Sequence, residues 1–221
     1  MSVTEKIKAT LWSNHGTREC PTEWDGRVYG GGKISQRYWE YLISIEMLDL
    51  KPDSVLIDIG GGSPTTGVGI FARSILSAGV KVIVVDENLG AMEGYDTPNL
   101  ILEKGLADKN TLSTLIEKYN PTHISCVSVL EHASAAQQMG IFEAIEASFH
   151  GEKAVFSFEF HETTCFVEQQ LTTTTLSNAV SCLKRFYLNR MEKSPLNCVN
   201  SVIDRDRLWY PLALQFNKIN F

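Results

Sequence analysis

The feature that most constrains the fold is the stretch of residues 54–88, which reads SVLIDIGGGSPTTGVGIFARSILSAGVKVIVVDEN. Residues 55–59 are apolar on both faces apart from Asp58, which is typical of a central parallel strand. Three glycines follow at 60–62, where the missing Cβ atoms let the backbone turn sharply and let a ligand lie close against it. Residues 82–85 form a second apolar run, which ends in Asp86. The pattern predicts a nucleotide-binding β-α-β unit.

The segment between these two strands is expected to be a helix. Ser63 is a natural helix cap and Pro64 suits the first helical position, so the sequence predicts that the helix begins there. Gly79 is placed to end it. The apolar stripe of this helix would consist of Val68, Phe71, Ala72, Ile75 and Leu76.

The glycine run helps to distinguish two families of nucleotide-binding proteins. A dinucleotide fingerprint, GxGxxG, needs a third glycine where this chain has Thr65. Residues 58–64, DIGGGSP, instead resemble the first motif of class I S-adenosylmethionine-dependent methyltransferases, (D/E)xGxGxG, with Pro64 in place of its third glycine. An acid such as Asp86 occurs in both families, because both ligands carry ribose hydroxyls. The resemblance implies S-adenosylmethionine as the cofactor.

The same resemblance implies which residues bind that cofactor. Asp58 would lie near the methionine ammonium group, and Asp86 would accept hydrogen bonds from the ribose diol. Asp108 would accept from the adenine amino group, unless it only caps a helix, and Leu89 or Leu106 would sandwich the ring. The expected cofactor-binding set is Asp58, Gly60, Gly61, Gly62, Asp86, Glu87, Leu106 and Asp108.

Catalytic side chains are expected after the fourth strand. Residues 129–132, VLEH, resemble a motif that follows this strand in many small-molecule methyltransferases. Neutral His132 would serve as a general base for a hydroxyl or amine acceptor, with Glu131 beside it. The alternative is that this pair only shapes the floor of the pocket. Nucleic-acid amino-methyltransferases carry (D/N/S)PP(Y/F) at this place, and the chain has no such tetrapeptide.

A second group of candidates lies at the end of the fifth expected strand. Alternation puts Glu159 and His161 on one face of that strand. We expect His161 to be an alternative base and Glu159 to bind substrate, together with Tyr29. With the Glu131–His132 pair nearby, these acids and histidines could also ligate a divalent cation. A polar substrate pocket is favoured, and no metal is assigned.

Composition limits the classes of protein to which the chain can belong. With 221 residues, of which 43% are hydrophobic, the chain can bury one sizeable core. We expect an N-terminal extension and cap helix over residues 1–50 and a methyltransferase domain over residues 51–221. The net charge of −6, without a basic run, argues against nucleic acid as a partner. Five cysteines without CxxC spacing favour reduced thiols in the cytoplasm, and no apolar run has membrane-spanning length.

The rest of the chain predicts alternating strands and helices. Strands are expected near residues 100–102, 123–129 and 153–160, and helices over 36–48, after Asp108, after Ser134 and over 176–188. Residues 198–203 and 209–219 are expected to be strands with no helix between them, which predicts an antiparallel hairpin. The expected fold is therefore α/β. It is the fold that the resemblance implies: a Rossmann-like, mostly parallel seven-stranded sheet with helices on both faces and a C-terminal antiparallel β-hairpin.

These features favour a methyltransferase that uses S-adenosylmethionine to methylate an oxygen or nitrogen of a small polar molecule. A homodimer is compatible with them. One alternative is a methyltransferase-like protein that binds its ligands without turnover. The other is an NAD(P)-dependent oxidoreductase, whose short-chain form needs Tyr-x-x-x-Lys on a helix after the fourth strand. The only such spacing here runs from Tyr29 to Lys33, before the first strand.

Overall fold

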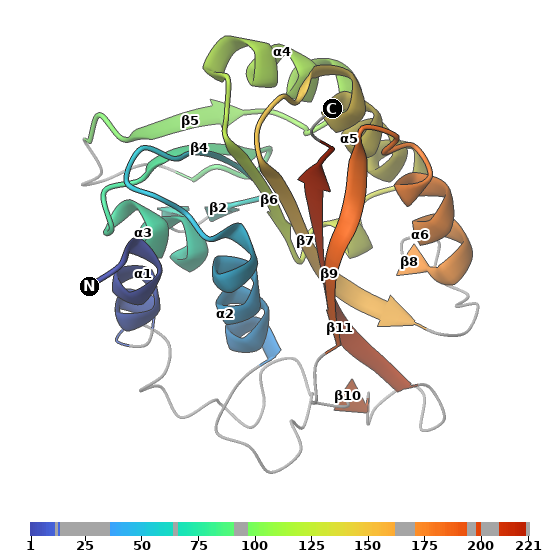
Figure 1. Cartoon of the computed structure of the whole chain (residues 1–221), viewed down its shortest axis with the longest axis horizontal. Coiled ribbons are helices and arrows are strands. Elements are labelled where there is room, and N and C mark those ends of the chain that lie inside the picture. The colour runs from blue at the N-terminus through green and yellow to red at the C-terminus, as the bar shows by residue number, and fades with distance from the viewer. Residues whose placement is uncertain are drawn as a thin grey trace.

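Among the residues that the structure describes, nine strands form a sheet through the centre of the molecule (Figure 1). The computed structural model describes residues 1–11, 13, 36–63, 66–90, 97–161, 171–193, 198–199 and 208–219. Within these ranges, the longer strands of the sheet are β1 (Val55–Ile59), β4 (Lys81–Asp86), β5 (Leu100–Lys104), β6 (His123–Val127), β7 (Lys153–His161), β9 (Phe186–Lys193) and β11 (Leu208–Lys218). Two-residue strands, β8 (Leu171–Thr172) and β10 (Cys198–Val199), extend it.

The strand order is β11-β7-β6-β1-β4-β5, with β9 on the outer side of β11. The pairs from β7 to β5 are all parallel, whereas β11 runs antiparallel to both β7 and β9. The last long strand is therefore inserted between two strands that precede it in the chain. The predicted mostly parallel sheet of seven principal strands, with an antiparallel end, is confirmed.

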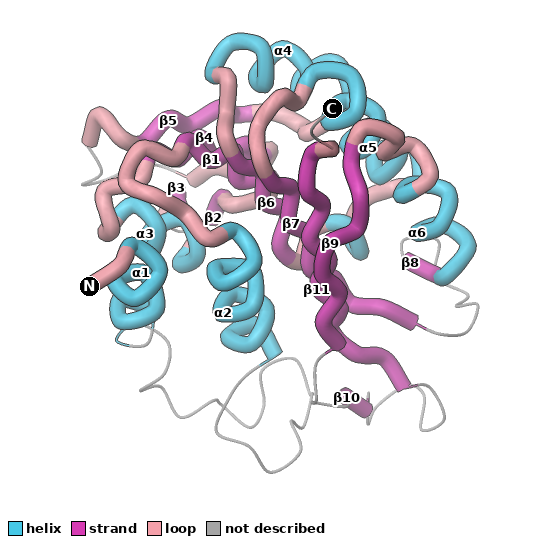
Figure 2. The backbone as a smooth tube through the Cα atoms, viewed as in Figure 1, coloured by secondary structure: helices cyan, strands magenta, loops and turns pink. Residues whose placement is uncertain are grey.

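The partner of the last strand differs from the prediction. β10 does pair with β11 antiparallel, but only over two residue pairs, and the long partner is β9 (Figure 2). The predicted helix over residues 176–188 was wrong at both ends, because α6 spans Thr173–Val180 and β9 begins at Phe186. β9 lies at the edge of the sheet, where Tyr187, Leu188 and Met191 are about half exposed or more. Without a buried face, an edge strand lacks the alternation by which a strand is recognised.

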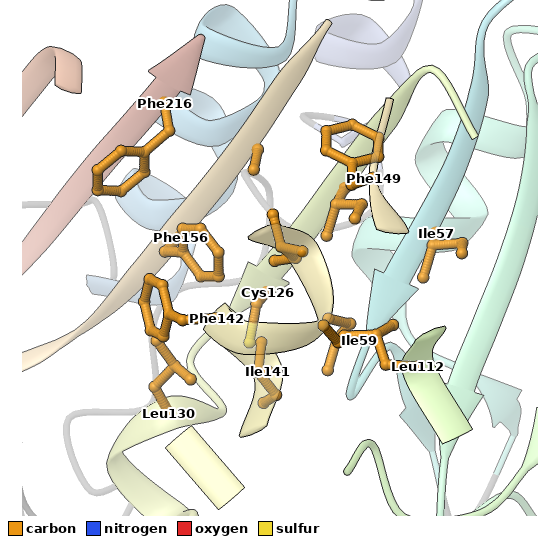
Figure 3. Close-up of a cluster of buried hydrophobic side chains, with 14 of the residues drawn as sticks. Ile57, Ile59, Leu112, Cys126, Leu130, Ile141, Phe142, Phe149, Phe156 and Phe216 are labelled. Atoms are coloured by element: carbon orange, nitrogen blue, oxygen red, sulfur yellow. The ribbon is translucent and has the colours of Figure 1, made fainter. Parts of the chain in front are cut away.

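Helices cover both faces of the sheet (Figures 1 and 2). On one face lie α1 (Val3–Leu11), α2 (Gln36–Leu48) and α3 (Ile70–Leu76); on the other lie α4 (Lys109–Tyr119), α5 (Ala135–Ser148) and α6. In the core under α5, Phe142 and Phe156 stack with their ring centroids 4.8 Å apart (Figure 3). The sequence analysis missed α1, although Val3, Ile7 and Leu11 recur every four residues and are buried against the core.

The caps explain where the helices begin. The Asp108 carboxylate accepts a hydrogen bond from the backbone N–H of Thr111 (2.8 Å), and Ser134 forms a capping box with Gln137, as expected for the starts of α4 and α5. The predicted start of α3 at Ser63 was wrong. Residues 62–63 (β2) pair antiparallel with residues 67–68 (β3), and the helix starts only at Ile70. Pro64 and Thr65 lie outside the described residues.

No helix in the described ranges combines the length and apolarity needed to cross a bilayer.

Candidate active site

The carboxyl ends of β1, β4, β5 and β6 surround a cavity of about 260 Å³. Each strand supplies part of the wall through the residues that follow it, and α5 closes one side. This is the edge of an open parallel sheet where ligands are expected. The residues of the wall include Gly60, Asp86, Glu87, Leu106, Ser128, Val129 and His132.

The Asp86 carboxylate is fixed by the backbone around it. The N–H of Gly62 donates to its Oδ2 (2.9 Å), and the N–H of Asn88 donates to its Oδ1 (2.7 Å). A carboxylate oxygen can accept more than one hydrogen bond, so each still has capacity for a donor in the cavity. Asp86 is therefore a preoriented acceptor pair at the end of β4, where the sequence predicts a ribose-binding acid.

The three glycines are required by close packing within the protein itself. Gly60 has φ of +71°, and a Cβ there would lie 2.2 Å from the side chain of Val129. A Cβ on Gly61 would lie 2.0 Å from Asp58 Oδ2, and one on Gly62 would lie 2.6 Å from the Asp86 side chain. The glycine turn thus lets both carboxylates sit directly beneath the backbone.

A second, smaller cavity of about 50 Å³ lies by the same turn, with Asp58 in its wall. The Asp58 side chain is 1% exposed, Ser125 Oγ donates to its Oδ1 (2.7 Å), and its Oδ2 has no hydrogen-bond partner among the described residues. Burial raises the pKa of Asp58 to about 7; the Ser125 hydrogen bond lowers it, and the Asp86 charge raises it further. A cation against Oδ2 would return this carboxyl to its ionised form.

Helix α2 supplies site residues that the sequence analysis did not single out. Tyr41 lines the smaller cavity, and burial raises the pKa of its hydroxyl. Glu40 is fully buried; Ser128 Oγ donates to its Oε2 (2.7 Å), and Arg37 Nη1 lies 3.4 Å from the same oxygen.

The structure separates the two residues of the LEH segment. Both lie in the short 3₁₀ turn η2 (Leu130–His132). His132 is exposed and lines the larger cavity, whereas Glu131 is 5% exposed and does not line either cavity. Burial raises the pKa of the Cys126 thiol, and the charges of Glu131 and Asp58 raise it further, so Glu131 lies on the core side of this turn.

The remaining predicted residues lie in different places. Glu87 and Leu106 line the larger cavity, and Leu106 is 42% exposed. Asp108 caps α4 and does not line the cavity; the Thr111 hydrogen bond lowers the pKa of its carboxyl. Glu159 and His161 belong to β7, but their side chains lie outside what the structure describes, and Tyr29 lies outside the described residues altogether. Among the described side chains, no three His, Cys, Asp or Glu residues come together to hold a metal ion.

Comparison with solved structures identifies this architecture. The geranyl diphosphate C-methyltransferase from Streptomyces coelicolor A3(2) aligns with a TM-score of 0.59 at 13% identity, over 82% of this chain and 79% of that one. An S-adenosylmethionine-dependent methyltransferase from Archaeoglobus fulgidus gives 0.57 at 15% identity, over 83% and 95%. One from Anabaena variabilis ATCC 29413 gives 0.56 at 11% identity, over 99% and 96%.

No family model and no curated protein matches the sequence. The similarity lies in the arrangement of strands and helices. It covers most of this chain and most of each of these three structures. The chain therefore has the class I S-adenosylmethionine-dependent methyltransferase fold.

Proposed function

We propose that this protein is an S-adenosylmethionine-dependent methyltransferase that acts on an oxygen or nitrogen of a small polar molecule. The observation that carries the proposal is the pair of cavities at the glycine turn, each with its own acid. Asp86 in the larger cavity suits a ribose diol, and buried Asp58 in the smaller one suits an ammonium group. A nicotinamide dinucleotide has no ammonium group for Asp58 to bind.

The wall residues fit the parts of this cofactor in order. Leu106 and Val129, which both line the larger cavity, offer apolar surface for the adenine ring. The cofactor would lie along the glycine turn between Asp86 and Asp58, and Tyr41 and Phe71 would cover its methionine end. Asp108 caps α4 and does not line the cavity, but it directly follows Leu106 and Ala107, which do. We propose that its carboxylate accepts a hydrogen bond from the adenine amino group at that edge of the cavity.

Catalysis would consist mainly of alignment. When bound, S-adenosylmethionine supplies a methyl group that is already electrophilic. The protein's task is then to hold an acceptor in line with it and to keep water out. A base is needed only for an acceptor that must lose a proton. His132 lies in the wall of the larger cavity, so we propose it as the first base to test, with Glu131 buried behind the turn. His161 is the alternative base, and the competing hypothesis is that His132 and Glu131 only shape the pocket.

Calorimetric titration with S-adenosylhomocysteine tests cofactor binding directly, with NADH as the control ligand. We expect binding of the first and none of the second. With S-adenosylmethionine, affinity should rise as the pH increases through about 7, because an ionised Asp58 attracts the ammonium group. Binding of NADH without a response to either adenosyl compound would overturn the proposal.

A binding protein without turnover is the second candidate, because the cavities alone do not require transfer. Release of S-adenosylhomocysteine in the presence of candidate acceptors separates the two. The panel should contain small alcohols, phenols and amines. It should also contain a prenyl diphosphate, because one similar structure is a geranyl diphosphate C-methyltransferase.

We also propose that the enzyme works in the cytoplasm on a small-molecule acceptor, without a nucleic-acid or membrane partner. The acidic net charge and the five cysteines without CxxC spacing support this. Light scattering after size-exclusion chromatography would decide between a monomer and a homodimer.

A further inference from the structure

Ser128 has an unusual backbone conformation in the wall of the larger cavity. It follows β6 and has φ of +53°. This is a left-handed backbone conformation, which residues other than glycine adopt only at a cost in free energy. Its N–H donates to the carbonyl of Ser157 on β7 (2.8 Å), which ties this backbone to the sheet. Such a residue is kept in place only when the surrounding structure holds it there.

Glu40 on α2 supplies a contact that can hold it. Ser128 Oγ donates to Glu40 Oε2 at 2.7 Å, and the two residues are 88 positions apart in the chain. Glu40 is 0% exposed and Ser128 7% exposed, so this charge-assisted hydrogen bond is shielded from water. Arg37, one turn earlier on α2, lies 3.4 Å from the same oxygen and balances the charge.

Ser128 begins the turn that walls the larger cavity. Val129 packs so closely on Gly60 that a Cβ there would lie 2.2 Å from its Cγ2. Two backbone hydrogen bonds connect the residues of the turn: the N–H of His132 donates to the Val129 carbonyl, and the N–H of Ala133 donates to the Leu130 carbonyl. The orientation of this turn relative to the glycine turn is therefore set largely at Ser128.

We propose that Glu40 is a positioning residue for the larger cavity. By holding Ser128 in its left-handed conformation, it places Val129 and His132 against the ligand, and it couples α2 to this wall. The identity of the ligand rests on the proposed function. The coupling itself concerns only residues of this chain.

The left-handed conformation of Ser128 allows the positioning role of Glu40 to be tested by substitution. Glu40→Ala should weaken binding of S-adenosylhomocysteine about tenfold, as measured by calorimetry, because Ser128 is released from its strained conformation. Glu40→Gln should recover most of that loss, since its amide oxygen can accept the same hydrogen bond. The double variant Glu40→Ala/Ser128→Gly should also bind more tightly than Glu40→Ala, because glycine adopts positive φ without cost. Glu46→Ala, an exposed glutamate on the same helix, is the matched control and should leave the affinity unchanged.

A ligand-free measurement keeps the test independent of the proposed function. In Glu40→Ala, the amide hydrogens of His132 and Ala133 should exchange about tenfold faster than in the wild type, and Ser128→Gly should slow them again. If the wild type binds no adenosyl ligand but exchange responds in this way, only the proposed function fails. If the wild type binds but Glu40→Ala changes neither affinity nor exchange, the positioning role is refuted. Failure of Ser128→Gly to rescue the Glu40→Ala variant would also refute it.

Discussion

Asp58 and His123 are two buried titratable side chains at opposite ends of neighbouring parallel strands. In the register of β1 and β6, Leu56 pairs with His123 and Asp58 pairs with Ser125. Each side chain is 1% exposed, and burial favours the neutral form of both. It raises the pKa of Asp58 to about 7 and lowers the pKa of His123 to about 4.

The surroundings of the two groups differ. Asp58 lies near the carboxyl edge in the wall of the smaller cavity beside the glycine turn, and its Oδ2 has no hydrogen-bond partner among the described residues. His123 lies at the amino edge, where Thr122 Oγ1 is 2.8 Å from its Nδ1 and Glu152 Oε2 is 3.9 Å from its Nε2. The same burial therefore prepares a ligand site at one edge and stabilises a neutral core histidine at the other. A perturbed pKa indicates a site only when an open cavity accompanies it.

Replacing Asp58 by asparagine gives the largest expected effect. Asp58 stays protonated in the fold while it ionises in the unfolded chain, so the wild type loses stability as the pH rises from about 4 to about 7. The loss amounts to about 4 kcal/mol at pH 8. The asparagine side chain does not titrate, so urea denaturation should show the Asp58→Asn variant gaining about 4 kcal/mol relative to the wild type between pH 4 and pH 8. A difference that does not change with pH would contradict the assignment.

His123→Gln should have the opposite dependence. His123 remains neutral in the fold below pH 6.5 while the unfolded chain takes up a proton, so the wild type loses about 3 kcal/mol as the pH falls from 6.5 to 4. The variant lacks this loss and should gain stability relative to the wild type at low pH. Its affinity for S-adenosylhomocysteine should be unchanged. Weaker binding would show that the two edges are not functionally separate.

Asp86→Ala should weaken S-adenosylhomocysteine binding by about 1.5–3 kcal/mol through loss of charge-assisted hydrogen bonds to the ribose. Asp49→Ala is the control at the amino edge, where Asp49 forms ion pairs with Lys51 and Lys153. Calorimetry should show a normal affinity for this control. Equal affinities for the Asp86 variant and the wild type would remove Asp86 from the site.

Leu106→Ala should give the smallest effect, a loss of about 1 kcal/mol in binding, because it removes only part of one apolar wall. Leu188→Ala is matched in exposure, at 46% against 42% for Leu106, but lies on β9 away from the cavity. Calorimetry should detect a change only for Leu106. The same loss in both variants would point to a general effect on stability.

The parts of the fold that could be predicted are those in which burial requires a regular pattern of apolar residues in the sequence. The apolar runs of β1 and β4, the glycine turn and the caps Asp108 and Ser134 are local signals, and each appears in the structure. β9 could not be found in this way because it is an edge strand with exposed apolar residues. The start of α3 was misplaced because the pairing of residues 62–63 with 67–68 overrides the cap signal at Ser63.

The residues of the site likewise divide into those that the sequence predicts and those that it does not. Asp58 and Asp86 follow from their positions at the ends of apolar runs, and both lie in cavity walls. Glu40 and Tyr41 could not be derived, because their role depends on how α2 packs over β6, a contact between residues far apart in the chain. A glutamate on an amphipathic helix ordinarily faces solvent. Only the packed structure shows that this one does not.

The insertion of β11 between β7 and β9 has a consequence for biosynthesis. Among the described strands, β9 pairs only with β11, so it can join the sheet only after residues 208–218 have been translated. Contacts of this kind join distant parts of the chain and slow folding. A nascent polypeptide emerging from the ribosome would expose the flank of β7 until β11 has been translated, and chaperones would bind it most readily during that interval.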